Sequence, residues 1–124
     1  MLPQGNLVTF IATNDLEQAK YFYQTVLGLT LVSEDAWVLG FMVNGARLRV
    51  TKVDYYYPPR YTVLGWSVAD IQAVVDELTE KEIPLERYEG LDQDDQGIWT
   101  APDGARVVWF KDPDGNILSV TQFP

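Results

Sequence analysis

The chain of 124 residues contains no cysteine and no histidine. Without cysteine it has no disulfides, no thiolate nucleophiles and no metal sites held by thiolates. Without histidine it lacks the commonest metal ligand and the commonest general base near neutral pH. Any catalysis would therefore depend on carboxylates, tyrosines or lysines.

Basic residues are also scarce, with 9 Lys and Arg against 18 Asp and Glu and a net charge of −9. Because no basic stripe is present, we expect no nucleic acid partner. No apolar run approaches the ~20 residues of a spanning helix, so we expect no membrane partner. The opening stretch MLPQGNLVTF lacks the pattern of a secretory signal, and a cytoplasmic location is the expectation.

The first half of the chain predicts a strand, a helix and three further strands. The strand LVTFIA is followed by the helical pattern of TNDLEQAKYFYQTVLG, with Asn14 as the expected N-cap and Gly28 as the terminator. Strand-like runs LTLVSE, WVLGFMV and ARLRVTKV come next, and Asn44-Gly45 predicts a hairpin between the last two.

The second half repeats this order after the proline-containing segment DYYYPPR. We expect a strand in YTVLGWSV, a helix in ADIQAVVDELTEKEI and a strand in PLERYE. A short hairpin around GIWTAPDGA leads to the strands ARVVWFK and ILSVTQF, which are joined by an Asp-Pro-Asp-Gly-Asn turn.

Two spacings indicate that the halves are a duplication. Asp15 and Asp70, which each open a helix, are 55 positions apart (70 − 15), and the run from Leu48 to Thr51 matches the run from Leu118 to Thr121 at an offset of 70 (118 − 48). The predicted fold class is α+β, with two tandem βαβββ modules in a single domain over residues 1–124. Module 1 covers about 5–53, a linker covers 54–60 and module 2 covers about 61–123.

Three stretches, DLEQAKYFYQTVLGL, LGWSVADI and FKDPDGNILSV, resemble the vicinal oxygen chelate superfamily, the group of glyoxalases, bleomycin-resistance proteins and extradiol dioxygenases. The resemblance implies paired modules that form a half-open curled sheet. It further implies a ligand site on the concave face and, often, a homodimer.

Metal-using members of this family carry four ligands, usually His, Gln or Glu, on the first and last strands of the two modules. Transferred by the resemblance, these positions are Val8, Arg49, Val63 and Ser119. None of the four is a usual metal ligand. We therefore expect no metal and no cofactor, and the catalytic residues stay unassigned.

Strand alternation from these positions predicts an apolar and aromatic pocket with a few hydroxyls and guanidinium groups. The residues expected to contact a small-molecule ligand are Phe10, Arg47, Arg49, Ser67, Trp109, Ser119 and Thr121. Arg49 can hold an anionic or strongly polar ligand group in bidentate fashion. The alternative is that Arg49 pairs with a carboxylate of the chain itself.

The remaining aromatic residues are assigned by the same alternation. Trp66 belongs to the helix-packing face, and Trp99 is a second candidate for a pocket wall beside Trp109. Trp37 is left without a predicted orientation. For the tyrosines Tyr55–Tyr57 we expect packing of the linker with polar tips in water, and a lid or a subunit contact is the alternative.

Three functions remain open at this point. The first is a metal-independent protein that binds a small organic molecule without turning it over. The second is a glyoxalase-like lyase, isomerase or dioxygenase-type enzyme that uses an atypical metal or none. The third is a regulatory or structural domain with a vestigial pocket.

Overall fold

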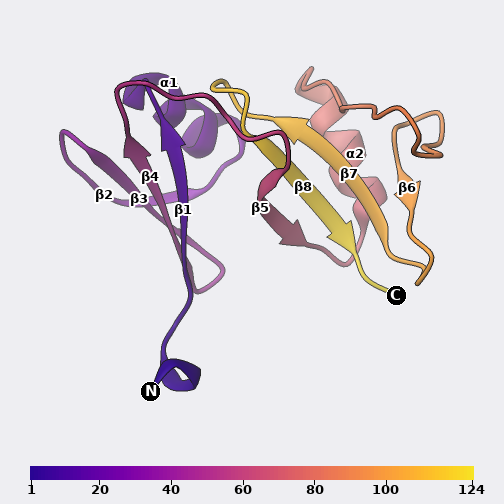
Figure 1. The fold of residues 1–124 in the computed structure, drawn as a ribbon, viewed down its shortest axis with the longest axis horizontal. Coiled ribbons are helices and arrows are strands. Elements are labelled where there is room, and N and C mark those ends of the chain that lie inside the picture. The colour runs from indigo at the N-terminus through magenta and orange to yellow at the C-terminus, as the bar shows by residue number, and fades with distance from the viewer. The chain divides into compact units, whose positions relative to one another are not determined.

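The computed structural model describes all 124 residues, and the chain divides into two compact units, Met1–Pro58 and Pro59–Pro124. Each unit contains one four-stranded sheet (Figure 1). No helix in the chain is long and apolar enough to cross a membrane.

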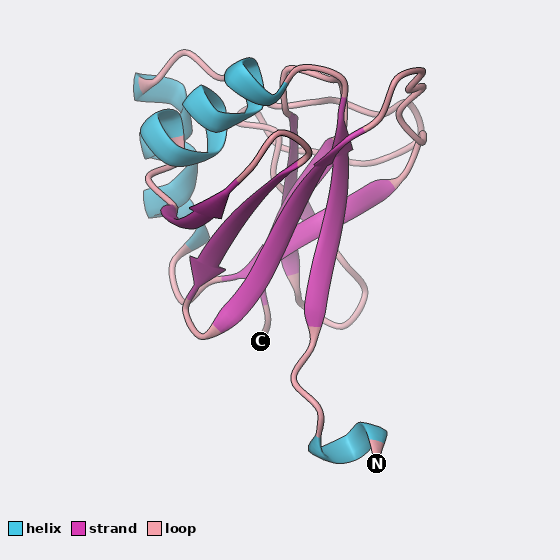
Figure 2. Ribbon diagram, turned by 90° about the vertical axis from the view of Figure 1, so that its left-hand side faces the viewer, coloured by secondary structure: helices cyan, strands magenta, loops and turns pink.

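Unit 1 has the element order β-α-β-β-β. Its elements are β1 (Val8–Thr13), α1 (Leu16–Lys20), β2 (Thr30–Glu34), β3 (Val38–Val43) and β4 (Ala46–Lys52). The strands lie in the order β1-β4-β3-β2, with β1 parallel to β4 and the other pairs antiparallel. A short 3-10 turn, Leu2–Gln4, precedes β1 at the end of an extended segment that leads away from the strands (Figure 2).

Unit 2 repeats the same order and the same pairing. Its elements are β5 (Thr62–Ser67), α2 (Ile71–Glu80), β6 (Trp99–Thr100), β7 (Arg106–Lys111) and β8 (Ile117–Gln122). The strands lie in the order β5-β8-β7-β6, with β5 parallel to β8. The prediction of an α+β fold made of two βαβββ modules is confirmed, and neither sheet closes into a barrel.

The duplication extends to the register of the strands. Phe10 lies opposite Arg49 in unit 1, and Gly65 lies opposite Ser119 in unit 2, at the sequence offsets of the two repeats. In the β3–β4 hairpin of unit 1, Asn44 and Gly45 both have positive φ, which is the conformation of a two-residue type I′ turn.

The helices begin at corresponding residues. Asp15 (φ −142°, ψ 98°) and Asp70 (φ −138°, ψ 94°) are the N-caps, and their carboxylates accept hydrogen bonds from the amides of Gln18 and Ala73 at 3.1 and 3.2 Å. The prediction of Asn14 as N-cap was wrong by one residue, because Asp15 is still extended and its carboxylate reaches the amide three residues on.

The first helix is less regular than its sequence pattern predicts. After α1 the chain widens into a π-helical segment, Tyr21–Val26, and the amide of Leu27 donates to the carbonyl of Phe22 at 2.9 Å. Gly28 ends the helix with φ 76°, as expected for a terminating glycine.

One face of each sheet is covered by the helix of its own unit, and we call it the helix face. In unit 1 it contains Ile11, Phe41, Leu48 and Val50, and in unit 2 it contains Val108, Phe110, Leu118 and Val120, all at most 4% exposed. Trp66 stacks on Phe110 with ring centroids 6.3 Å apart, so it lies on the helix face as predicted. Burial of this face supplies the hydrophobic core of each unit.

The strand predicted in PLERYE does not form. Between Ile83 and Tyr88 the chain makes one sheet-like hydrogen bond, from the amide of Glu86 to the carbonyl of Trp109 at 2.8 Å. The backbone instead pairs with the side-chain amide of Gln93, which accepts from the Tyr88 amide at 2.8 Å and donates to the carbonyls of Glu86 and Gly97 at 3.0 and 2.9 Å.

This arrangement generates a stability prediction. The substitution Gln93→Glu removes the amide donor and places a negative charge beside two carbonyl oxygens, so we expect the free energy of unfolding to fall by about 2 kcal/mol. Gln96→Glu makes the same chemical change at an exposed residue of the same loop and is the matched control. Urea unfolding followed by tryptophan fluorescence measures both, and equal effects of the two substitutions would contradict the structural role of Gln93.

Candidate functional site

The second face of each sheet is not covered by the unit's own helix, and we call it the open face. In unit 1, Phe10 and Arg49 are direct neighbours on this face, and Arg47 lies two residues before Arg49 on the same strand. Phe10 is 63% exposed, and both arginines are exposed, whereas the alternate residues Leu48 and Val50 are buried. The structure therefore brings three of the predicted ligand-contacting residues together.

The guanidinium group of Arg49 has no carboxylate within 4.0 Å. The ion pairs of the structure are Lys20–Glu34 at 3.0 Å, Lys81–Glu77 at 2.9 Å and Lys111–Glu86 at 3.3 Å. The alternative in which Arg49 pairs with a carboxylate of the chain is therefore not realised. Its charge is available to another partner.

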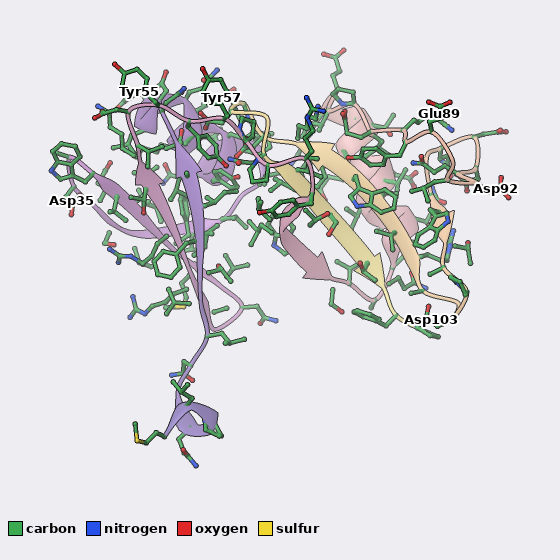
Figure 3. The ribbon with its side chains drawn as sticks, in the orientation of Figure 1. Asp35, Tyr55, Tyr57, Glu89, Asp92 and Asp103 are labelled. Atoms are coloured by element: carbon green, nitrogen blue, oxygen red, sulfur yellow. The ribbon has the colours of Figure 1, made fainter.

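Asp35, in the turn between β2 and β3 (Figure 3), is held by backbone groups. Its carboxylate accepts hydrogen bonds from the amides of Trp37 and Val38 at 2.8 and 2.9 Å. These two bonds lower the pKa of Asp35, and the charge of Arg49 makes the smallest contribution to that lowering. Asp35 is thus a turn residue and no ion-pair partner of Arg49.

In unit 2 the open face carries the other four predicted residues. Ser119 lies between Gly65 on β5 and Trp109 on β7, and Thr121 lies opposite Ser67. A Cβ atom at Gly65 would lie 2.7 Å from Ser119 Oγ, which is closer than real Cβ atoms come. The absence of a side chain at Gly65 therefore gives the Ser119 hydroxyl its place on this face.

The four positions that carry metal ligands in metal-using members fit a divalent ion poorly. Val8 and Val63 have no donor atom, Arg49 is a cation, and Ser119 offers a single neutral hydroxyl. No group of three His, Cys, Asp or Glu side chains in the structure could hold a metal ion. We therefore derive no step of chemistry through a metal at these positions.

An aromatic cluster covers part of the open face of unit 2. The edge of Tyr88 meets Trp109 with ring centroids 5.4 Å apart, and Trp99 meets the same ring at 6.1 Å. Both predicted wall residues, Trp99 and Trp109, are thus in contact. Tyr88 was missed because it falls in the segment predicted as a strand, and it reaches Trp109 only through the fold imposed by Gln93.

A pocket of about 210 Å³ adjoins this cluster. It is lined by Arg60, Tyr61, Thr62, Tyr88, Trp109 and Ile117. Only Trp109 among these residues was predicted to contact a ligand. The Tyr88 hydroxyl oxygen is closed to water and has no hydrogen-bond partner.

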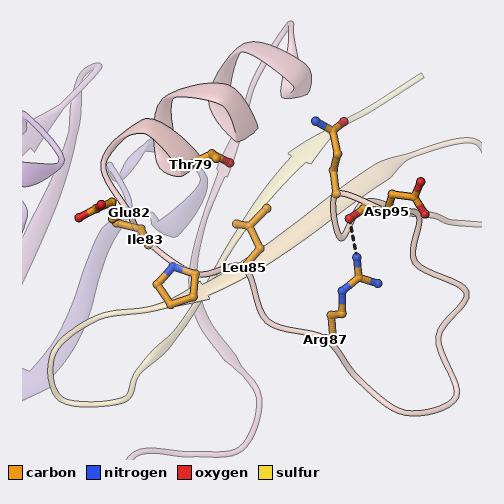
Figure 4. A pocket seen from close by; sticks show the side chains of 8 residues that line it. Thr79, Glu82, Ile83, Leu85, Arg87 and Asp95 are labelled. Carbon is orange, nitrogen blue, oxygen red and sulfur yellow. Dashed lines mark hydrogen bonds between the residues drawn. The ribbon is translucent and has the colours of Figure 1, made fainter.

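A second pocket, of about 570 Å³, lies between the C-terminal end of α2 and the loop that precedes β6 (Figure 4). It is lined by Thr79, Glu82, Ile83, Pro84, Leu85, Arg87, Asp95 and Gln96. Arg87 is already engaged, since its Nη2 donates to the carbonyls of Asp94 and Asp95 at 2.7 and 2.8 Å. None of the predicted site residues lines this pocket.

The linker tyrosines differ from expectation. Tyr55 and Tyr57 are 93% and 91% exposed and point away from unit 1 (Figure 3), so the expected packing of these two side chains was wrong. Pro58 and Pro59 follow directly, and Pro58 disfavours a helical backbone at Tyr57, so this segment belongs to no helix or strand. Trp37, left unassigned from the sequence, is 63% exposed.

Comparison with known proteins gives a consistent result. The family model described as the Glyoxalase/Bleomycin resistance protein/Dioxygenase superfamily matches residues 6–120. Among curated proteins, none matches the chain significantly.

Solved structures share the fold across nearly the whole chain. A lactoylglutathione lyase from Agrobacterium tumefaciens is 24% identical with a TM-score of 0.72, and the match covers 97% of this chain and 94% of that chain. A glyoxalase/bleomycin resistance protein/dioxygenase from Alicyclobacillus acidocaldarius is 21% identical (TM-score 0.71, 98% and 92% covered). A glyoxalase family protein from Enterococcus faecalis is 22% identical (TM-score 0.70, 98% and 100% covered).

The buried hydroxyl of Tyr88 leads to a prediction about stability and pH. Tyr88→Phe removes an unpaired buried polar group, so we expect the free energy of unfolding to rise by about 1 kcal/mol. Burial, and to a smaller extent the charge of Glu86, raises the pKa of Tyr88 above 10.0. As the pH rises above 10.0, Tyr88 of the unfolded chain loses its proton while Tyr88 of the folded chain keeps it. The free energy of unfolding of the wild type therefore falls with pH, and that of Tyr88→Phe has no such contribution.

Urea unfolding of both proteins at pH 8 and near pH 10.5 measures this difference. The other tyrosines titrate in both proteins and cancel in the comparison. A gap between variant and wild type that narrows toward high pH would contradict the raised pKa.

Proposed function

Because the chain belongs to the glyoxalase/bleomycin resistance protein/dioxygenase superfamily, we propose that it binds a small organic molecule on the open faces of its sheets, without the metal that metal-using members hold. The observation that carries the proposal is the occupancy of the four metal positions by Val8, Arg49, Val63 and Ser119. These residues offer one neutral hydroxyl and a cation where a divalent ion would need several anionic or imidazole donors.

Arg49 gives the ligand its proposed chemistry. Its guanidinium group is exposed on the open face of unit 1 and has no carboxylate within 4.0 Å. Phe10 lies beside it as an exposed aromatic surface, and Arg47 adds a second positive charge two residues away. A guanidinium group beside an aromatic ring suits a molecule with an apolar body and an anionic or strongly polar group.

The open face of unit 2 offers neutral contacts. Ser67, Ser119 and Thr121 supply hydroxyls, and Trp109 supplies a large flat surface. This mixture of apolar area with a few polar groups is typical of small-molecule sites. We propose these four residues as ligand contacts on the open face of unit 2.

Binding without turnover is the simpler form of the proposal. The charged residues near the sheets that could act as acid or base, Glu34, Glu86 and Lys111, are each engaged in an ion pair. The proposal includes a homodimer as the working form and a cytoplasmic location. It includes no nucleic acid partner, since the net charge is −9.

The role of Arg49 is tested by substitution. We expect Arg49→Ala to weaken binding by about tenfold or more, because a charge-assisted contact is lost. Lys52→Ala removes one positive charge from the end of the same strand and is the matched control. Calorimetric titration with the molecule that native mass spectrometry finds in the purified protein measures the affinity, and equal affinities of wild type and Arg49→Ala would exclude Arg49 from the site.

Metal independence is tested by elemental analysis of the purified protein. We expect no transition metal in stoichiometric amount and no loss of ligand affinity after treatment with a chelator. One equivalent of Zn, Ni, Mn or Fe per chain would overturn this part of the proposal. Native mass spectrometry of the same sample reports the oligomeric state, and a monomer at micromolar concentration would contradict the proposed homodimer.

A further inference from the structure

The pocket of about 210 Å³ in unit 2 is formed entirely by residues of that unit. Arg60 and Tyr61 precede β5, which begins at Thr62, and Ile117 is the first residue of β8. Trp109 lies on β7 and contacts the rings of Tyr88 and Trp99. Ile117 is 7% exposed and forms an apolar part of the lining. The walls are therefore largely aromatic and aliphatic.

Three polar side chains line the same pocket without a partner in the protein. The Tyr88 hydroxyl is buried and makes no hydrogen bond. The Arg60 side chain takes part in no ion pair or hydrogen bond, and neither does the hydroxyl of Thr62. A buried hydroxyl without a partner destabilises a fold, and Tyr88 is one of the residues that line the pocket. A ligand in the pocket that reaches this oxygen would supply the missing hydrogen bond.

We propose that this pocket binds a small aromatic or conjugated carboxylic acid, with the carboxylate paired to Arg60 and hydrogen-bonded by the Tyr88 hydroxyl. The planar body of the acid lies against Trp109 and Ile117. Because water does not reach the Tyr88 oxygen, contact with the ligand requires a small rotation of the Tyr88 side chain toward the cavity.

The chemistry of the lining sets the ligand class. A guanidinium group and a hydroxyl donor together favour an anionic acceptor over a cation or a neutral amide. Since burial raises the pKa of Tyr88, its hydroxyl stays protonated near neutral pH and is available as a donor. The volume lies below the range of about 300–1,000 Å³ that suits drug-sized molecules, which limits the ligand to one or two rings.

This inference rests on the proposed function in one respect, that the protein binds small organic molecules. It goes beyond that function because it assigns a ligand class and uses Arg60, Tyr88 and Ile117, which lie outside the residue set proposed above; the two sets share Trp109. It also does not require Arg49.

The test is calorimetric titration with 2-naphthoate as the probe and its neutral counterpart 2-naphthalenemethanol. We expect 2-naphthoate to bind the wild type at least about tenfold more tightly than the alcohol. Tyr88→Phe and Arg60→Gln should each weaken 2-naphthoate binding by about tenfold or more. Tyr55→Phe removes a hydroxyl at a tyrosine that is 93% exposed, and Lys52→Gln removes one positive charge at an exposed lysine of unit 1. Both should leave the affinity unchanged.

A structural role alone would give a different pattern. If Tyr88 served only to pack against Trp109, Tyr88→Phe would keep the ring contact and bind 2-naphthoate as the wild type does, which would overturn the inference. Binding that is insensitive to both Tyr88→Phe and Arg60→Gln would also overturn it and leave the proposed function standing. Absence of 2-naphthoate binding to the wild type would overturn it as well, while a molecule found by native mass spectrometry would still support the proposed function.

Discussion

The structure depends on the parallel pairing of the first and last strands in each unit. β1 pairs with β4 and β5 pairs with β8, and these pairings fix which residues face the helix and which face away. Because side chains alternate along a strand, a slip of one residue would move the buried set to the open face. The burial of Val50 and Val120 on corresponding strands holds the register in place, and the exposure of Arg49 and the position of Ser119 follow from it.

The two sheets share their strand order and register, but their open faces carry different side chains. Phe10 and Gly65 are corresponding residues, as are Arg49 and Ser119. Unit 1 therefore presents an aromatic ring beside a guanidinium group, whereas unit 2 presents bare backbone beside a hydroxyl. The helix faces stay apolar in both units because the core requires it, and the open faces can differ because the helix of the unit does not pack on them.

Much of this arrangement is predictable from the sequence because it rests on short-range patterns. The alternation of apolar residues and the Asn44-Gly45 hairpin are local signals, and each led to the observed element. The match of Asp15 with Asp70 spans 55 positions, and it identified the start of both helices because each aspartate caps its own helix locally. The errors have local causes as well. Asn14 and Asp15 are both good capping residues, and only the backbone conformation decides between them.

The pocket of unit 2 was beyond prediction for a different reason. The segment that contains Tyr88 has the composition of a strand, but its backbone forms hydrogen bonds with the side chain of Gln93. Strand and helix propensities do not account for such side-chain bonds. The contact between Tyr88 and Trp109 thus depends on a polar side chain acting in place of a neighbouring strand. Long-range contacts of this kind leave no periodic trace in the sequence.

The ring and the hydroxyl of Tyr88 have different roles in the proposed pocket. The packing of Tyr88 against Trp109 is a contact between rings, whose centroids lie 5.4 Å apart in a T-shaped arrangement. The oxygen adds a desolvation cost without a compensating hydrogen bond in the protein. The unpaired hydroxyl of Tyr88 therefore lowers the stability of the protein without ligand. The same pocket lining contains the unpaired guanidinium of Arg60, and both groups are donors that suit an acid. The interaction that this part of the structure lacks is therefore the one that a carboxylate ligand would supply.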